Sequence, residues 1–225
     1  IGDQFVIAPS PNGNLRLIAV GNLDGAFLDT GLYGQAQIFM SDMNSSSVYG
    51  FNTLGDANLT ALGNKDLHAG TILHAEDRTP VEIRAGGDIL DLWFSVPKEG
   101  SVSAGGDIVD IFYYGQNTRN DSSTVLSAGG DILFGSTQST GNLENTGIKV
   151  AGPGFLLVQA GGDMDLGTTS GIQSLGNAFL SALGSDGVDI IVTAGYAMSP
   201  DAKGLTDFFG DLKTAGEEYA NLLAA

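Results

Sequence analysis

The chain contains no cysteine, which excludes disulfides, zinc–thiolate sites, iron–sulfur clusters and cysteine nucleophiles. Basic residues are also scarce: nine Lys and Arg stand against 26 Asp and Glu, so the formal net charge is −17. Nucleic acids and anionic membranes bind proteins chiefly through Lys and Arg, and these nine are scattered from Arg16 to Lys213 without forming a patch. We therefore expect neither nucleic-acid binding nor attachment to an anionic membrane.

Long apolar runs are missing too. No run approaches the roughly 20 residues that span a bilayer, so no membrane insertion is expected. There are only 6 Pro, and the 34 Gly follow no every-third-residue pattern, which excludes collagen. The chain begins at Ile1 without a signal peptide, as expected of a mature product or a piece of a longer protein. Whether Ile1 is a natural terminus stays open, as does the length of any parent protein.

Glycine and aspartate are plentiful instead. Both are poor helix formers and good turn formers, so the composition argues against a helical bundle. Hydrophobic residues make up 42% of the chain, which is enough to build a buried core.

The strongest signal is an internal repeat with the pattern apolar-x-Ala-Gly-Gly-Asp-apolar. Weaker echoes occur at 59–64 and 192–195. The four clear copies span residues 83–89, 102–108, 126–132 and 158–164.

Each copy predicts a strand, a turn and a second strand. The first apolar residue and the Ala point to the same side, while the residue between them, such as Arg84 or Ser103, is polar and points outward. Gly-Gly permits either a positive φ or a close approach of two backbones. The Asp is suited to an Asx-turn with the turn's own backbone. We expect the second strands over 89–94, 108–114 and 132–134.

Repeats of this length with several short strands favour an all-β fold, a right-handed parallel β-helix (solenoid) over residues 1–199. A β-sandwich or meander is the rival architecture. Polar residues at 115–124 and 135–147 are expected to loop out of the coils. Strands are expected at 15–20 and 35–40, but the register within 1–58 is not defined by the sequence.

The C-terminus has a different pattern. Over 200–225, apolar residues recur every three or four positions, which predicts a short amphipathic helix. The helix would cap the last coil or, alternatively, bind a partner or begin a further domain. The apolar positions are Leu205, Phe208, Phe209, Leu212, Ala215, Tyr219 and Leu222.

No catalytic motif is present, and we assign no catalytic, cofactor-binding or metal-binding residue and expect no enzyme activity. His68 and His74 lie near acidic residues, but on an extended strand they would be about 20 Å apart, too far to share a metal ion unless a turn folds them together.

Two columns of acidic residues are the better candidates for a site. Stacked carboxylates must point apart, bind the backbone or share cations, so two interpretations stay open: structural Asx-turns and bound Ca²⁺, the one cofactor that we consider. The first column is Asp88, Asp107, Asp131 and Asp163, and the second is Asp91, Asp110 and Asp165.

Aromatic residues follow two of the repeats. They predict either ring stacking within the core and wall or an exposed strip that stacks on sugars. A β-helical polysaccharide lyase would also need a Lys or Arg near paired carboxylates, and the sequence places none beside an Asp group. The aromatic residues are Trp93, Phe94, Phe112, Tyr113 and Tyr114.

The Ala-Gly-Gly-Asp-Ile units resemble those of filamentous haemagglutinin-family exoproteins, the large β-helical adhesins of Gram-negative bacteria. Residues 148–155, 159–168 and 171–177 look like the C-terminal part of that family's β-helix, and the resemblance covers about residues 80–196. It implies a right-handed parallel β-helix, secretion through an outer-membrane pore and display at the cell surface or in the medium. It carries over no catalytic residue.

These observations together predict a structural or adhesive segment of a secreted, cell-surface exoprotein, forming a stiff rod or fibre for adhesion or cell–cell contact. The expected partners are the outer-membrane secretion pore and a receptor or glycan on a host or neighbouring cell, and self-association is allowed. The alternatives are a calcium-stabilised extracellular matrix or filament module and, less favoured, the polysaccharide lyase. The sequence does not identify the receptor, the oligomeric state or any calcium dependence.

Overall fold

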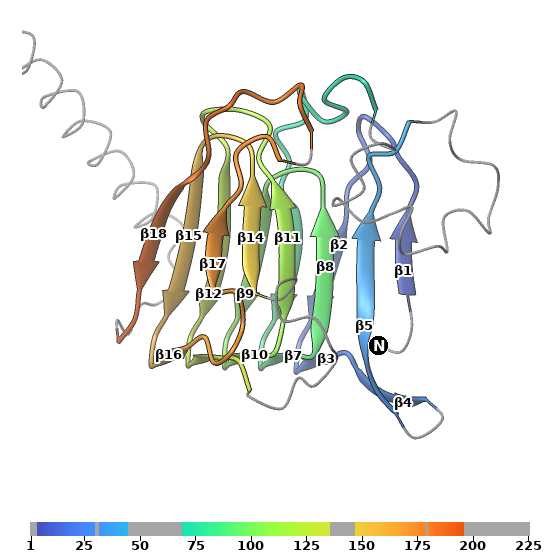
Figure 1. Ribbon diagram of the computed structural model, residues 1–225. Helices are drawn as coiled ribbons and strands as arrows, with labels where there is room; N and C mark the ends of the chain where they lie inside the picture. Colours follow the sequence, from blue (N-terminus) through green and yellow to red (C-terminus); the bar gives the residue numbers. More distant parts are fainter. Residues whose placement is uncertain (1–3, 30–31, 45–68, 136–146, 179, 196–225) are drawn as a thin grey trace, which may run out of the picture.

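A computed structural model describes residues 4–29, 32–44, 69–135, 147–178 and 180–195. In these residues all regular structure is β, and the strands form three sheets that stand as adjoining walls (Figure 1). All strand pairs are parallel except β4–β5, so the sandwich or meander of antiparallel hairpins is wrong.

The three sheets are named here by their strands. Sheet A contains β1 (Gln4–Ile7), β5 (Leu32–Met40), β8 (Leu92–Val96), β11 (Phe112–Gln116), β14 (Ile148–Ala151) and β17 (Ile172–Ser174), with β4 (Ala26–Asp29) antiparallel to β5. Sheet B contains β2 (Arg16–Ala19), β6 (Val81–Ala85), β9 (Gly100–Ala104), β12 (Ser123–Ala128), β15 (Phe155–Ala160) and β18 (Asp189–Thr193). Sheet C contains β3 (Leu23–Asp24), β7 (Ile89–Leu90), β10 (Ile108–Val109), β13 (Ile132–Leu133) and β16 (Met164–Asp165).

The chain visits the sheets in the order B, C, A, and each visit to all three makes one layer of the stack. Equivalent residues of successive repeats therefore pair: Ala85 lies beside Ala104, Ala104 beside Ala128, and Ala128 beside Ala160. The glycine turns join sheet B to sheet C at the lower edge in Figure 1, and longer loops join sheet A to sheet B at the upper edge. The predicted stacking of repeats is confirmed at the level of three parallel sheets.

The core lies between the sheets and is built from columns of inward residues. The predicted alternation holds: Ile83 and Ala85 are buried, while Arg84 between them is exposed. Small alanines fill the corner between sheets B and C, and larger aliphatic residues fill the centre. One column, Ile89, Ile108 and Ile132, is entirely inaccessible or nearly so.

The second strand of each repeat is shorter than predicted. Instead of one strand over 89–94 or 108–114, two strands meet at a corner, which falls at Asp91 in one layer and at Asp110 in the next. Both residues have a positive φ, 51° and 52°, which interrupts an extended strand. Asp tolerates this left-handed conformation better than most side chains, a signal that sequence reasoning missed.

The N-terminal layer also contains a copy of the repeat, in which other residues replace one glycine and the aspartate. The expected strands at 15–20 and 35–40 correspond to β2 and β5. Ala19-Val20-Gly21-Asn22-Leu23 lies in register with residues 85–89, since Ala19 pairs with Ala85 and Leu23 with Ile89. The echo at 192–195 is confirmed by the pairing of Val192 with Val158. The echo predicted at 59–64 lies outside the described residues.

The prediction that 115–124 loops out of the stack is wrong for most of the segment. Its first two residues end β11 and its last two begin β12. Asn117, Ser122 and Thr124 are fully buried, because they fill the corner between sheets A and B. Of the second predicted loop, residues 136–146 lie outside the described part, as does the predicted helix over 200–225.

Candidate functional site

The Gly-Gly pair of each repeat exists because neighbouring layers approach closely, not because the backbone needs a positive φ. Neither Gly105 nor Gly106 has a positive φ. A Cβ on Gly105 would overlap the carbonyl oxygen of Gly86 in the preceding layer, and a Cβ on Gly106 would overlap a carboxylate oxygen of Asp88. Of the two roles that the sequence left open, close approach is therefore the correct one.

In the first three repeats the Asp binds the next layer. Asp88 Oδ1 accepts a hydrogen bond from the backbone N–H of Asp107 at 2.8 Å, and Asp107 Oδ1 accepts one from Asp131 at 2.8 Å. Asp131 Oδ1 continues the series with the N–H of Asp163 at 2.7 Å, and Asn22 begins it with the N–H of Asp88 at 2.9 Å. We call these five residues the Asp ladder. The Asx-turn prediction is wrong for Asp88, Asp107 and Asp131, because the Oδ1 atom of each accepts its hydrogen bond from the next layer rather than from its own turn.

The second acidic column is not a single column. Asp91 and Asp110 lie at equivalent corners, but Asp165 lies beside Leu133, one position earlier in the layer. Asp165 and Asp24 do form Asx-turns, since each accepts a hydrogen bond at 2.8 Å from the N–H two residues later. Burial raises the pKa of Asp91, and the nearby charges of Asp110 and Asp24 raise it further.

The described residues contain no group of three His, Asp or Glu side chains placed to hold a metal ion. In the ladder, one oxygen of Asp88, Asp107 and Asp131 already accepts a backbone hydrogen bond. Hydrogen bonds between layers thus account for one carboxylate oxygen of each of these three residues.

A second group of charges lies at the corner between sheets A and B. Lys98 Nζ lies 2.5 Å from Asp77 Oδ2, and the Lys98 side chain is fully buried. Arg119 lies 3.0 Å from Glu99 and also donates to the carbonyl oxygen of Asp77 at 3.0 Å. The sequence clusters no Lys or Arg near an Asp group, whereas the fold brings Lys98 against Asp77 from 21 residues away. We call this group the charged cluster: His74, Asp77, Arg78, Lys98, Glu99, Arg119 and Asp121.

The charged cluster is built for packing rather than for chemistry on a substrate. Lys98 and His74 are inaccessible to solvent, so neither can reach a bound polysaccharide. Burial and the charge of Lys98 lower the pKa of His74, whose Nδ1 lies 3.8 Å from Asp77 Oδ2. The cluster joins residues 74–78 to two successive loops of the stack. His68, the other histidine, lies outside the described residues.

The aromatic residues form core and wall, which confirms the stacking interpretation. Phe94 and Tyr113 lie inside the stack with ring centroids 6.3 Å apart, and both are fully buried. On the outer side of sheet A, Trp93 meets Phe112 and Tyr114 edge-on at 6.4 and 6.0 Å. Phe112 and Tyr114 are only 7% and 8% exposed, and burial raises the pKa of Tyr114 to about 12. The exposed sugar-stacking strip is therefore wrong.

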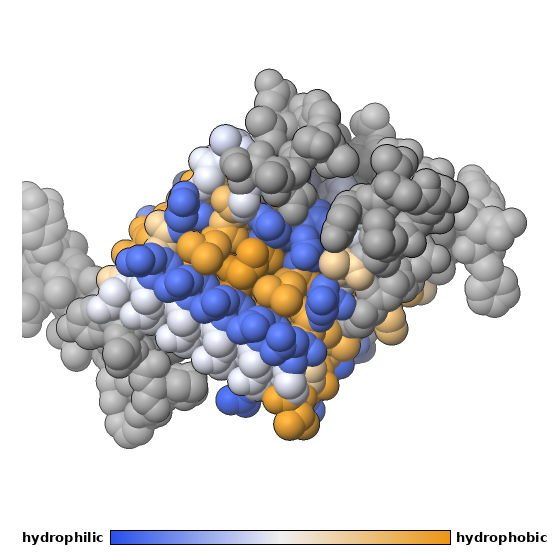
Figure 2. Space-filling view, turned by 90° about the horizontal axis from the view of Figure 1, so that it is seen from below, coloured by the Kyte–Doolittle hydropathy of each residue, from blue (hydrophilic) through white to orange (hydrophobic). Residues whose placement is uncertain are grey.

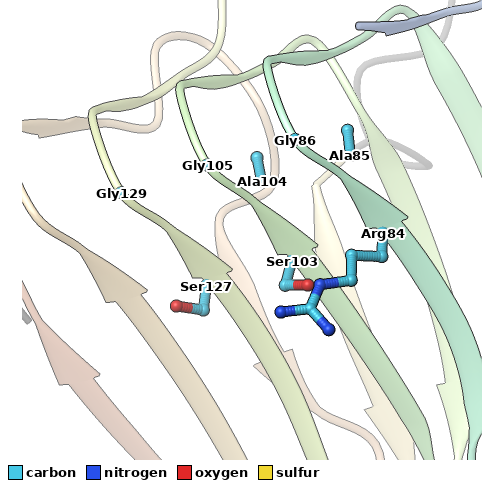
Figure 3. Close-up of a pocket in the computed structure, with 8 residues that line it drawn as sticks. All are labelled: Arg84, Ala85, Gly86, Ser103, Ala104, Gly105, Ser127 and Gly129. Carbon is cyan, nitrogen blue, oxygen red and sulfur yellow. The ribbon is translucent and has the colours of Figure 1, made fainter. Parts of the chain in front are cut away.

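Two hollows lie on the outer side of sheet B. One measures about 160 Å³ and is lined by Arg84, Ser103 and Ser127 together with glycines of the turn (Figure 3). The other measures about 330 Å³ and is lined by residues that include Arg16, Glu82 and Ser101. Cavities that bind small molecules usually measure about 300–1,000 Å³, so the first is too small for such a ligand and the second only reaches the lower limit.

Comparisons of the chain with protein-family models, with curated proteins and with solved structures find no match. The described residues include no helix long and apolar enough to cross a membrane.

Proposed function

We propose that the chain is a segment of a right-handed parallel β-helix in a secreted, cell-surface exoprotein that resembles the filamentous haemagglutinins. In this proposal its role is mechanical and adhesive: it forms part of a stiff rod that holds binding regions away from the cell. The observation that carries the proposal is the Asp ladder, because the same turn recurs in register through five consecutive layers.

The stiffness follows from the way in which the layers are joined. Neighbouring layers share hydrogen bonds in all three sheets, and each layer adds inward residues to continuous apolar columns. The Asp ladder adds a carboxylate–amide bond at one corner, and bonds to charged acceptors are stronger than those between neutral groups. Bending the stack would break several of these contacts at once.

The absence of cysteine suits secretion through an outer-membrane pore, since a chain without disulfides can cross the envelope unfolded. We assign the chain no catalytic role. The one buried lysine beside a carboxylate is enclosed, which is the opposite of what a lyase would need.

We also propose that residues 200–225 form the predicted helix and cap the stack. The last described strand, β18, leaves the inward-facing Ile190 and Val192 39% and 46% exposed. Gly195 has a φ of +73°, unlike the first glycine of each earlier repeat, and the next residue is Tyr196. In the earlier repeats the N–H of the first glycine binds the carbonyl oxygen of the preceding layer's alanine, as from Gly161 to Ala128, whereas the N–H of Gly195 binds Gly162, so the regular turn ends at this layer.

The distance between two spin labels tests the stack. Because the chain has no cysteine, labels attach only to the cysteines that are introduced. Labels on Ile18→Cys and Thr193→Cys are five layers apart, or about 24 Å at about 4.8 Å per layer. A single narrow distance distribution near this value is expected. A broad distribution would contradict a stiff rod.

The surface role needs a separate experiment. Antibodies raised against the chain should label intact cells that produce the parent protein, and beads coated with the folded chain should adhere to host cells more than beads coated with heat-unfolded chain. Labelling that appears only after the cells are permeabilised would contradict the proposed location, and equal adherence would contradict an adhesive role.

A further inference from the structure

The outer face of sheet C carries a short apolar strip. Leu90, Val109 and Leu133 occupy equivalent positions in three successive layers and are partly exposed. At the two ends of the same row the residues are Asp24 and Asp165, both exposed. Figure 2 views this face from below and shows an apolar strip that runs along the stack beside a continuous hydrophilic row. We call this surface the sheet C face.

Carboxylates border the strip on its long sides as well. The Asp ladder runs along one side, two residues before each apolar position, and Asp91 and Asp110 lie on the other side, one residue after Leu90 and Val109. Burial raises the pKa of Asp91, and the negative charges of Asp110 and Asp24 on this face raise it further. Carboxylates thus lie at both ends of the strip, along one long side and, beside Leu90 and Val109, along the other.

No described basic residue neutralises this surface, because none belongs to sheet C or to its turns. Most of them have partners elsewhere: Arg16 pairs with Glu82, Lys98 with Asp77, and Arg119 with Glu99. Arg78 pairs with Asp121 and Lys149 lies over the ring of Tyr114, while Arg84 lines the small cavity on sheet B. The described basic residues therefore do not cover the carboxylates that border the strip, and a cationic partner can approach them.

We propose that the sheet C face is a docking surface for a basic amphipathic helix of another polypeptide. The layers repeat about every 4.8 Å and an α-helix turns every 5.4 Å, so apolar residues at i, i+4 and i+7 match the three positions of the strip. Lys and Arg beside that stripe would then lie over the two acidic borders. This inference does not depend on the proposed adhesive role.

The charge pattern excludes two other occupants. The described residues of a second copy offer little basic surface, because most of the basic residues among them are already paired. Residues 201–225 carry five acids and two lysines, which gives −3, so this segment would be repelled by the face. The strip is small and ringed by charge, so the binding should be weak, fast and sensitive to salt.

The test uses the full chain and two synthetic peptides of about 18 residues, both made of leucine and lysine. One peptide places its leucines along a single helical stripe, and the other has the same composition with the leucines scattered. Binding is measured by fluorescence anisotropy at about 50 mM salt, where surface charges are weakly screened. The striped peptide should bind at least about tenfold more tightly than the scattered one.

Variants locate the site. Val109→Lys should weaken binding of the striped peptide by about tenfold or more, because it places a positive charge in the strip. Val109→Thr keeps the shape and charge and should weaken binding by about threefold through the lost apolar contact. The matched control is Ser103→Lys, which adds the same charge to the outer side of sheet B and should change the affinity by less than about twofold. Circular dichroism checks that each variant is folded.

Three results would overturn the proposal. Equal affinity for the two peptides would show charge attraction without a docking surface. Equal losses for Val109→Lys and Ser103→Lys would place the binding elsewhere. A dimer in light scattering that Val109→Lys converts to monomer would assign the face to a second copy. None of these results bears on the spin-label distance or on cell-surface labelling, so this proposal and the adhesive role can fail separately.

Discussion

The corner between sheets B and C and the corner between sheets A and B both turn the chain, but with different chemistry. The first uses the same Gly-Gly-Asp unit in layer after layer, with backbone approach and one carboxylate–amide bond per step. The second has no repeated unit and relies on the charged cluster and on buried side-chain hydrogen bonds, such as that from Thr124 to Asn117. The comparison shows that a regular stack does not need the same residues at every corner.

The two corners also differ in how an error would propagate. A defect in the Gly-Gly-Asp corner affects two adjacent layers, because each unit fits against the one before it. A defect in the charged cluster affects loops of several layers at once, since Asp77 contacts both Lys98 and Arg119. We therefore expect the substitution that lowers the free energy of unfolding most to lie in the charged cluster.

The largest expected effect follows Lys98→Met. It leaves the carboxylate of Asp77, which is only 10% exposed, without its buried counter-charge. Removing one partner of a buried ion pair typically costs about 3–5 kcal/mol of unfolding free energy. Urea denaturation measures the loss, and the double variant Lys98→Met/Asp77→Asn should recover part of it because no charge is left unpaired. A double variant less stable than the single one would show that the pair is not the cause.

The next effect follows Gly129→Ala. The new Cβ would overlap the carbonyl oxygen of Gly105, which is backbone and cannot move without shifting a whole layer. We expect a loss of about 3 kcal/mol, at the upper end of the usual cost of overpacking.

The control for the glycine variant comes from the same motif. Gly21 occupies the second glycine position of the first layer, and a Cβ there would meet nothing within 4 Å. Gly21→Ala should therefore be neutral or slightly stabilising in thermal unfolding. If both variants lowered the melting temperature equally, close approach between layers would not be the reason for the glycines.

The difference between the corners also explains what the sequence predicts. The Gly-Gly-Asp unit is visible because every layer needs the same small residues at the same place, and the register of three sheets follows from it. The first copy was not recognised because Val20 and Asn22 replace a glycine and the aspartate. Among the described strands β2 and β3 end their sheets, so no described layer presses against Val20 and a side chain fits there. The sequence identifies the residues of the Asp ladder but not their hydrogen-bond partners. An Asp that binds its own turn and an Asp that binds the next layer have the same local sequence pattern.

The charged cluster is hidden for a different reason. Asp77, Lys98 and Arg119 are about 20 residues apart in the chain, and only the height of one layer brings them together. Polar residues at 115–124 indicated a solvated loop, whereas their hydrogen bonds are made inside the corner. Periodicity does not distinguish these two cases.

A moderate effect is expected along the ladder. Asp131→Ala removes the acceptor for the N–H of Asp163 and should cost about 1–2 kcal/mol. Asp131→Asn keeps an acceptor, as Asn22 does in the first layer, and should stay within about 0.5 kcal/mol of the parent. Chemical denaturation compares the two. An Asn variant as unstable as the Ala variant would mean that the charge, rather than the hydrogen bond, joins the layers.

The smallest expected effect is a pH dependence of stability that arises from His74 in the charged cluster. Because burial and Lys98 lower the pKa of His74, the unfolded chain binds a proton at this residue near its ordinary pKa of 6.5 while the folded chain does not. Stability from this residue is therefore full above that pH and falls as the pH drops below it. His74→Gln should flatten the dependence of the urea midpoint between about pH 7.5 and 5.5. Lys98→Met should flatten it less, because it removes only the second of the two causes and leaves the burial of the ring. If His74→Gln left the pH dependence of the urea midpoint unchanged, other groups would cause that dependence. Packing of residues 74–78, rather than their charge, would then stabilise the corner between sheets A and B.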